Sequence, residues 1–226
     1  VGAVVNDQYL LKNWCHALNG YGAHTWYLDK ALTSQEISPT YYQTENVAVS
    51  TKKHAFWGYG VGQGSFDSST NDIIAYDDDL VRVQLHENAA APEDLRRNRG
   101  GAKAGEGEEY ALFAGGYTNS SSERYSSAVS AISEDLTISQ IGNLSEAKAL
   151  SRGISLAGGF SFFTPGSTSN YKPLYCDVFD PDLTHSVLDN PKDPPQSGVM
   201  TWSKPLENLL IGDGYSFGSG LFVYEQ

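Results

Sequence analysis

Short runs of alternating apolar and polar residues recur along the chain and are separated by turns. The segment AVSAISEDLTISQI at 128–141 alternates, turns on the residues EDL and then resumes the alternation. A period of two residues predicts β-strands, and the short polar break predicts a tight turn between them. No stretch of the sequence shows convincing helical periodicity, so the pattern predicts an all-β protein.

This pattern repeats along the chain with two landmarks. The first is a mostly apolar or aromatic strand, often close to glycine, which begins at Tyr9, His54, Tyr110, Phe160 and Asn208. The second is a leucine at an Asp-rich turn, found at Leu32, Leu80, Leu136 and Leu183. The first landmarks lie 45, 56, 50 and 48 residues apart, and the leucines lie 48, 56 and 47 apart. Because both series contain the same long second interval, the sequence indicates a true repeat.

The first four units each contain four strand-like segments in a fixed order, and the fifth unit has the first three of them. A strand of small residues comes first, then the aromatic strand, an alternating strand, the Asp-rich turn and an outer strand. The small residues predict inner strands crowded near a shared axis, at about 1–6, 47–52, 100–105, 153–158 and 198–203. Glycine pairs such as Gly115 and Gly116 allow a strand to end abruptly, since glycine adopts backbone angles closed to other residues.

This layout resembles the kelch repeat, which is a four-stranded blade of a β-propeller, and is most similar to the kelch-like repeats of bacterial and bacteriophage proteins. The resemblance rests on YALFAGG at 110–116, AYDDDL at 75–80, VFDPDL at 178–183 and LSEAKALSRG at 144–153. It implies one propeller domain over 1–226, with units at about 1–45, 46–97, 98–151, 152–197 and 198–226. We expect five blades closed into a ring, with part of a larger propeller as the alternative.

The charge of the chain excludes two classes of partner. The formal net charge is −12 and the pI is about 4.7, so the protein should repel nucleic-acid phosphates and anionic membranes. No apolar run approaches the roughly 20 residues needed to cross a bilayer. One basic segment, LRRNRGGAK, contains Arg96, Arg97, Arg99 and Lys103. We expect a solvated loop there, with a site for an anion or a carboxylate as the alternative.

No recognisable catalytic motif occurs in the sequence. It has no G-x-S-x-G elbow, no H-E-x-x-H helix and no phosphate-binding loop, and its five histidines are scattered. Cys15 and Cys176 form neither a metal-ligand spacing nor a disulfide framework. We therefore predict no catalytic residue, metal or cofactor. The Asp-rich turns could supply oxygen ligands for Ca²⁺, but turn chemistry explains their recurrence better.

Paired carboxylates for glycoside hydrolysis are a second catalytic possibility. Such a pair must lie within about 5 to 10 Å. The candidate residues are Asp67, Glu106, Glu108, Glu109 and Asp213. The sequence does not bring any two of them together, so a carbohydrate-active enzyme remains an alternative hypothesis.

The loops that follow the aromatic strands are the strongest candidates for function. By repeat symmetry they emerge on one face of the ring, and they carry aromatic side chains among Ser, Asn, Gly and Thr: Phe66, Tyr117, Tyr125, Tyr171 and Tyr215. Rigid aromatics among small polar groups are typical of adaptable binding surfaces. We therefore predict a non-catalytic recognition module for a surface glycan or a protein partner. A purely structural assembly domain is a further alternative, and the resemblance implies an extracellular or virion-associated setting, such as a phage tail.

Overall fold

The computed structural model describes the backbone in five antiparallel sheets, and side chains in the three central ones. The described residues are 2–5, 8–17, 20–28, 31, 33–39, 47–59, 72–86, 96–97, 99–118, 125–149, 151–164, 166, 175–189, 199–202, 209–215 and 221–225. The prediction of an all-β protein is confirmed: within the described residues the one helical turn, η2, spans only Ala157–Gly159. No helix in these ranges has the length and apolar character needed to cross a membrane.

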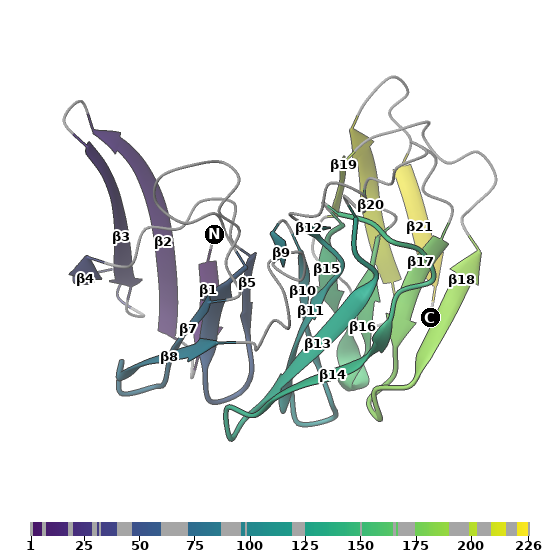
Figure 1. Cartoon of the computed structure of the whole chain (residues 1–226), viewed down its shortest axis with the longest axis horizontal. Helices are drawn as coiled ribbons and strands as arrows, with labels where there is room; N and C mark the ends of the chain where they lie inside the picture. The colour runs from purple at the N-terminus through teal and green to yellow at the C-terminus, as the bar shows by residue number, and fades with distance from the viewer. Residues whose placement is uncertain are drawn as a thin grey trace.

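In each of the five sheets the strands follow one another in chain order, and the third sheet leaves out β12 (Tyr117–Thr118) (Figure 1). The first contains β1 (Gly2–Val5), β2 (Gln8–Ala17), β3 (Gly20–Leu28) and β4 (Ser34–Pro39), and the second contains β5 (Val47–Ser50), β6 (Ala55–Gly58), β7 (Asp72–Tyr76) and β8 (Arg82–His86). The third contains β10 (Gly100–Ala104), β11 (Tyr110–Ala114), β13 (Ala128–Ser133) and β14 (Ile138–Asn143). The fourth contains β15 (Gly153–Ser155), β16 (Ser161–Phe163), β17 (Tyr175–Phe179) and β18 (His185–Asp189), and the fifth contains β19 (Val199–Trp202), β20 (Leu209–Tyr215) and β21 (Leu221–Glu225).

The five sheets follow the five predicted units, one sheet to each unit. The inner strands β1, β5, β10 and β15 are neighbours in space in the order of the chain. A two-stranded ribbon of β9 (Arg96–Arg97) and β12 (Tyr117–Thr118) links the segment before the third sheet to a loop within it. This arrangement is compatible with a β-propeller, although the described strands do not close the array into a ring.

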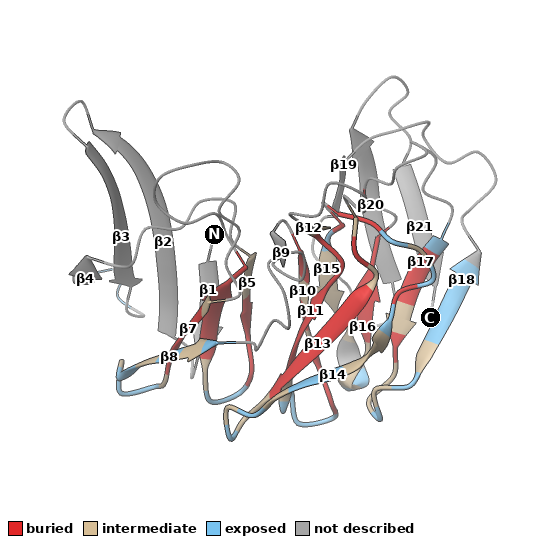
Figure 2. Cartoon of the chain, viewed as in Figure 1, coloured by how far each residue is buried: buried red, intermediate tan, exposed pale blue. Residues whose placement is uncertain are grey.

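Among the described residues, two hydrophobic clusters join adjacent sheets, and two others lie within a single sheet, the second or the fourth. The buried parts of these sheets are red in Figure 2. One cluster joins the second and third sheets, with Phe56 and Tyr59 packed against Phe113 and its neighbours. Another joins the third and fourth, with Leu112 beside Phe163 and Phe179. Adjacent residues of β11 therefore point into different interfaces, which explains why Ala111–Ala114 are all buried. Burial of each large apolar side chain contributes about 1.5 to 3 kcal/mol.

The leucine landmarks occupy the same turn in three sheets, which confirms the repeat register. Leu80, Leu136 and Leu183 all have left-handed backbone angles, with φ of 62°, 65° and 64°. Each donates its N–H to the residue three positions earlier, closing a tight hairpin between the third and fourth strands. The conformation costs a leucine about 1 to 2 kcal/mol. Each leucine side chain packs against a hydrophobic cluster, and this burial offsets the strain. Leu32 lies outside the described residues.

The small residues of the inner strands allow the sheets to approach one another closely, as the sequence predicts. A Cβ at Gly153 would overlap the backbone of Gly101 in the neighbouring sheet, and a Cβ at Gly101 would lie 2.6 Å from Cγ2 of Val47. Further along, the N–H of Gly105 donates to the carbonyl of Gly159 at 3.0 Å. The inner edges of three successive sheets are therefore in backbone-level contact.

We predict that Gly153→Ala destabilises the protein by about 1 to 3 kcal/mol, because the overlapping atoms belong to the backbone and have no free rotation. Denaturant unfolding measures the free energy of unfolding. Gly107→Ala is the matched control, since its new methyl group would meet only the flexible side chain of Glu109, and it should change stability by no more than about 0.5 kcal/mol. Equal stability of the two variants would contradict this explanation of the inner strands.

Candidate functional site

The structure places two of the five predicted binding residues together. Tyr117 and Tyr125 come from the two ends of one loop, and their backbones form an isolated antiparallel bridge. Their rings lie with centroids 5.0 Å apart at an interplanar angle of 42°, and both residues are partly exposed. Tyr215 lies in β20, for which the backbone alone is described, and Phe66 and Tyr171 lie outside the described residues.

A set of backbone hydrogen bonds holds the base of this tyrosine pair. The N–H of Gly116, next to Tyr117, donates to the carbonyl of Lys148 at 2.8 Å. The N–H of Lys148 donates to the carbonyl of Ser126, next to Tyr125, at 3.0 Å, and the N–H of Ser126 donates to Gly116 at 2.8 Å. Lys148 thus contacts both ends of the loop through its main chain.

Glycine is required at the point where β11 passes into this loop. Gly115 has φ of 67°, and Gly116 has φ of 115°. A Cβ at Gly115 would overlap the carbonyl oxygen of Lys148. The glycine pair therefore gives the strand an abrupt end and allows the segment around Lys148 to lie against the loop.

The side chain of Lys148 is fully buried and crosses to the fourth sheet. Its Nζ lies 2.5 Å from Oδ2 of Asp177 in β17 and donates to the carbonyl of Tyr175 at 3.0 Å. The side chains of both Lys148 and Asp177 have no exposed surface. The other carboxylate oxygen accepts the N–H of Ser145 at 2.6 Å and contacts Nε2 of His185 at 2.7 Å. This ion pair connects the base of the tyrosine loop to the next sheet.

The surroundings of Asp177 favour its charged form. Burial alone would raise the pKa of Asp177, but the Lys148 ammonium, the hydrogen bond from it, and those from Ser145 and His185 outweigh burial. The pKa of Asp177 therefore lies below its usual value. The carboxylate is ionised at neutral pH and serves as the counter-charge for a buried ammonium.

A second buried cation, Arg99, occupies the corresponding place between the second and third sheets. It donates to the carbonyls of Phe113 and Ala128 at 2.5 and 2.9 Å and to Oγ of Ser130 at 3.2 Å. Its guanidinium also lies 4.3 Å from the ring centroid of Tyr59. Ser130 precedes Leu136 by six residues, as Asp177 precedes Leu183. Each cation therefore reaches the same position in the third strand of the following sheet.

The expectation of a solvated loop for the basic segment is wrong at Arg99, which is only 4% exposed. The arginine is buried because carbonyl oxygens and an aromatic face satisfy a planar, weakly hydrated guanidinium well. Nearby, Lys103 forms an ion pair with Glu108 at 2.7 Å. Arg96 and Arg97 form β9, of which only the backbone is described.

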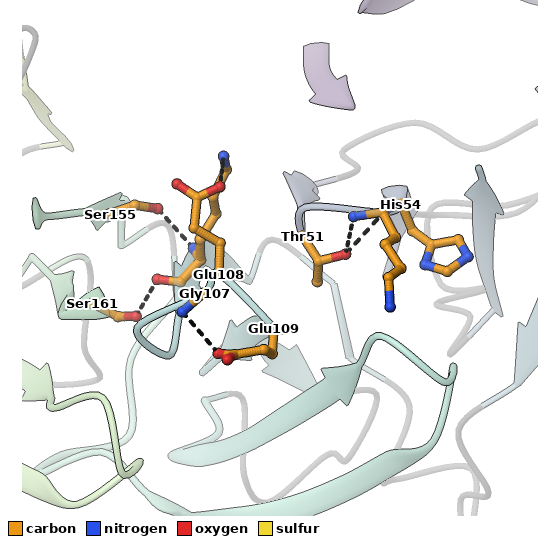
Figure 3. A network of polar contacts seen from close by, with 9 residues as sticks. Thr51, His54, Gly107, Glu108, Glu109, Ser155 and Ser161 are labelled. Carbon is orange, nitrogen blue, oxygen red and sulfur yellow. Dashed lines mark hydrogen bonds and ion pairs between the residues drawn. The ribbon is translucent and has the colours of Figure 1, made fainter. Parts of the chain in front are cut away.

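Two candidate acids of the third sheet, Glu108 and Glu109, bond within its inner hairpin (Figure 3), and the third, Glu106, is exposed. Glu108 bonds to Lys103, and Oε2 of Glu109 accepts the N–H of Gly107 at 3.2 Å. Ser155 and Ser161 of the fourth sheet bond to the backbone of Lys103 at 2.7 and 2.5 Å. These contacts stabilise the turn and its packing. Asp67 lies outside the described residues, and no side-chain position is described for Asp213.

The Asp-rich turns also use their carboxylates on the backbone. Oδ1 of Asp77 accepts the N–H groups of Asp79 and Val81 at 3.0 and 2.8 Å, and Oδ1 of Asp180 accepts that of Thr184 at 2.7 Å. Aspartate therefore recurs there because it caps the turn. Among the described residues, no three His, Cys, Asp or Glu side chains gather in a way that could hold a metal ion.

Sequence reasoning did not identify the Lys148–Asp177 pair. One signal pointed to it: Asp177 is the only charged residue in the strand YCDVF, and a carboxylate between apolar neighbours usually has a buried partner. The segment LSEAKAL contained the partner, but nothing in the sequence pairs the two residues. Nothing in the sequence distinguished Arg99 from the other basic residues of its segment.

Comparison with known proteins extends the fold assignment but not the function. No family model matches the chain, and no curated protein matches it. Among solved structures, that of YjhT aligns with 100% of this chain and with 78% of the YjhT chain. The TM-score is 0.62 and the sequence identity is 11%. At this identity the similarity shows the fold alone, which is an all-β, propeller-like fold.

We predict that Asp177→Asn destabilises the protein strongly at neutral pH, by about 3 to 5 kcal/mol, because it leaves the Lys148 ammonium buried without a counter-charge. The pKa of Asp177 is lower in the folded state. Its stabilising contribution is therefore fully present above the unfolded value of about 3.9 and is lost as the pH falls through the folded value. The difference in unfolding free energy between the wild type and the variant should therefore be smaller at pH 3 than at pH 7.

The control for this prediction is Asp182→Asn, which changes an exposed aspartate of the adjacent turn. Its stability should follow the wild type at both pH values. If the difference between Asp177→Asn and the wild type were the same at pH 7 and pH 3, the ionised form of Asp177 would not be the source of the stabilisation.

Proposed function

We propose that this chain is a kelch-like β-propeller of five blades that recognises a surface glycan without catalysis. Support for the blades comes from the repeat register, the four-stranded sheets and the structural similarity to YjhT. Support for recognition comes from one observation, which is the tyrosine pair Tyr117–Tyr125. Its rings are partly exposed at the loop end of the third sheet.

The geometry around the pair suits binding of a sugar. Aromatic faces pack against the CH groups of a sugar. The sequence between the two tyrosines also contains serine and asparagine, residue types that can form hydrogen bonds with sugar hydroxyl groups. The loop base is fixed by Gly116, Ser126 and Lys148, and Lys148 is anchored in turn by the buried pair with Asp177. Binding to a pre-organised pair costs little conformational entropy, so a modest contact area can give measurable affinity.

A carbohydrate-active enzyme is not favoured by a specific observation. It requires two converging carboxyl groups, one of them with a raised pKa. Two described carboxyls have shifted pKa values, and both shifts are downward: Asp135 through its hydrogen bonds with Ser133 and Thr137, and Asp177 through Lys148 despite its burial.

We predict that Tyr117→Ala combined with Tyr125→Ala weakens glycan binding by at least about tenfold, or about 1.4 kcal/mol, because both ring faces are lost. A glycan array that includes bacterial surface polysaccharides identifies the ligand, and titration calorimetry then gives the affinity. Tyr117→Phe is the matched control: it keeps the ring face and should retain most of the binding.

The folding of the double variant is checked by its thermal unfolding. Unchanged affinity in a folded double variant would exclude this pair as the binding site. Absence of any saturable glycan ligand for the wild type would overturn the glycan proposal itself and shift attention to a protein partner.

A further inference from the structure

The outer strands of the sheets differ in how they protect their free edges. An unprotected edge strand offers unpaired N–H and C=O groups to any other strand. β4 pairs with β3 through an irregular register and ends at Pro39. β14 pairs with β13 across a shift between Val129 and Ser130. Bulges and proline are recognised ways of preventing further pairing.

β8 is protected by polar side chains instead. Arg82, Gln84 and His86 are exposed along it, while Val83 and Leu85 pack against the cluster between the second and third sheets. The strand therefore alternates in the ordinary way, and its exposed surface is polar and partly charged.

β18 has none of these protections. Its pairing with β17 is regular over all five residues, and β17 is its one partner among the described strands. Val187 is 43% exposed and Leu188 is 41% exposed, although neighbouring residues point to opposite faces of a strand. Ser186 is also exposed, and most of the strand is pale blue in Figure 2. Both faces of its centre therefore present uncharged side chains to solvent.

The backbone of β18 is also suited to further pairing. The carbonyl of Thr184 accepts the N–H of Asp180, so it points toward β17. In an antiparallel ladder this direction alternates from residue to residue. The N–H and C=O groups of His185, Val187 and Asp189 consequently point away from β17, toward the free edge.

We propose that β18 pairs antiparallel with β18 of a second copy of this chain, about a two-fold axis at Val187. In this register the backbones of residues 185, 187 and 189 form the hydrogen-bonded pairs. His185 of each copy is then in register with Asp189 of the other. Ser186 faces Leu188, and Val187 faces itself. The sequence HSVLD is therefore complementary to itself, as a two-fold interface requires.

The proposed interface is small, because only five residues of each copy take part. Interfaces of this size are weak and depend on protein concentration. The pairing goes beyond the recognition function proposed above: it would join two fourth sheets edge to edge and leave the tyrosine pairs of both copies on the loop ends of their third sheets.

The first test is sedimentation velocity of the whole chain over a range of concentrations. We expect a monomer–dimer equilibrium for the wild type. Val187→Lys should abolish the dimer, since it places two like charges directly opposite each other. Gln84→Lys, at the centre of β8 and exposed, is the matched control and should dimerise like the wild type. A wild type that stays monomeric throughout, or a dimer that survives Val187→Lys, would overturn the proposal.

The second test examines the register. Ser186 and Leu188 of opposite copies form a non-hydrogen-bonded pair, whose Cβ atoms lie about 4.5 to 5.5 Å apart. A mixture of Ser186→Cys and Leu188→Cys chains should therefore form a disulfide-linked dimer under mild oxidation, well above the level that either variant gives alone. Equal cross-linking in the mixture and in the separate variants would exclude this register, even if a dimer exists.

Discussion

The ion pair between Lys148 and Asp177 is the contact on which the tyrosine loop and the sheet-to-sheet packing both depend. Lys148 uses its main chain to join the two ends of the loop and its side chain to reach β17. Removing two charges from water is expensive, and such a pair contributes little net stability compared with apolar packing. Its value is geometric: a buried ammonium tolerates one position of its carboxylate, so the pair fixes how the third and fourth sheets are aligned.

Apolar side chains also join neighbouring sheets. Adjacent residues of β11, such as Leu112 and Phe113, belong to different clusters on opposite faces of the sheet. Neither cluster forms without the neighbouring sheet, so the third sheet depends on the second and the fourth to bury its apolar surface. Loops anchored at these interfaces are consequently held by two sheets at once, which is the kind of rigid support that binding residues require.

The sequence was sufficient for the features that repeat and insufficient for those that do not. Leu80, Leu136 and Leu183 could be aligned because one strained turn requires the same residue and the same spacing. The small inner residues around Gly101 and Gly153 indicated crowding for the same reason. The contacts of Lys148 with Asp177 and of Arg99 with Ser130 could not be found, because they join residues 29 and 31 positions apart. Their distances from the next inner strand also differ, so periodicity does not reveal that they are equivalent.

The sequence also could not predict that the rings of Tyr117 and Tyr125 lie close together. The sequence assigns both residues to one loop. It does not show that their rings are in contact, because the path of a loop depends on hydrogen bonds such as that from the N–H of Ser126 to the carbonyl of Gly116. The glycine pair that ends β11 and the carboxylates that cap the turns, by contrast, follow from local backbone chemistry.

The two cation positions have a consequence for how such a chain can change by recombination. The third strands β13 and β17 each carry the acceptor for the cation of the preceding segment. Ser130 accepts from Arg99, which also contacts the ring of Tyr59, and Asp177 pairs with Lys148. A duplicated third unit inserted in place of the fourth would bring a serine to the buried ammonium and leave its charge uncompensated. The units share one architecture, but their borders are matched pair by pair, so they are not interchangeable modules.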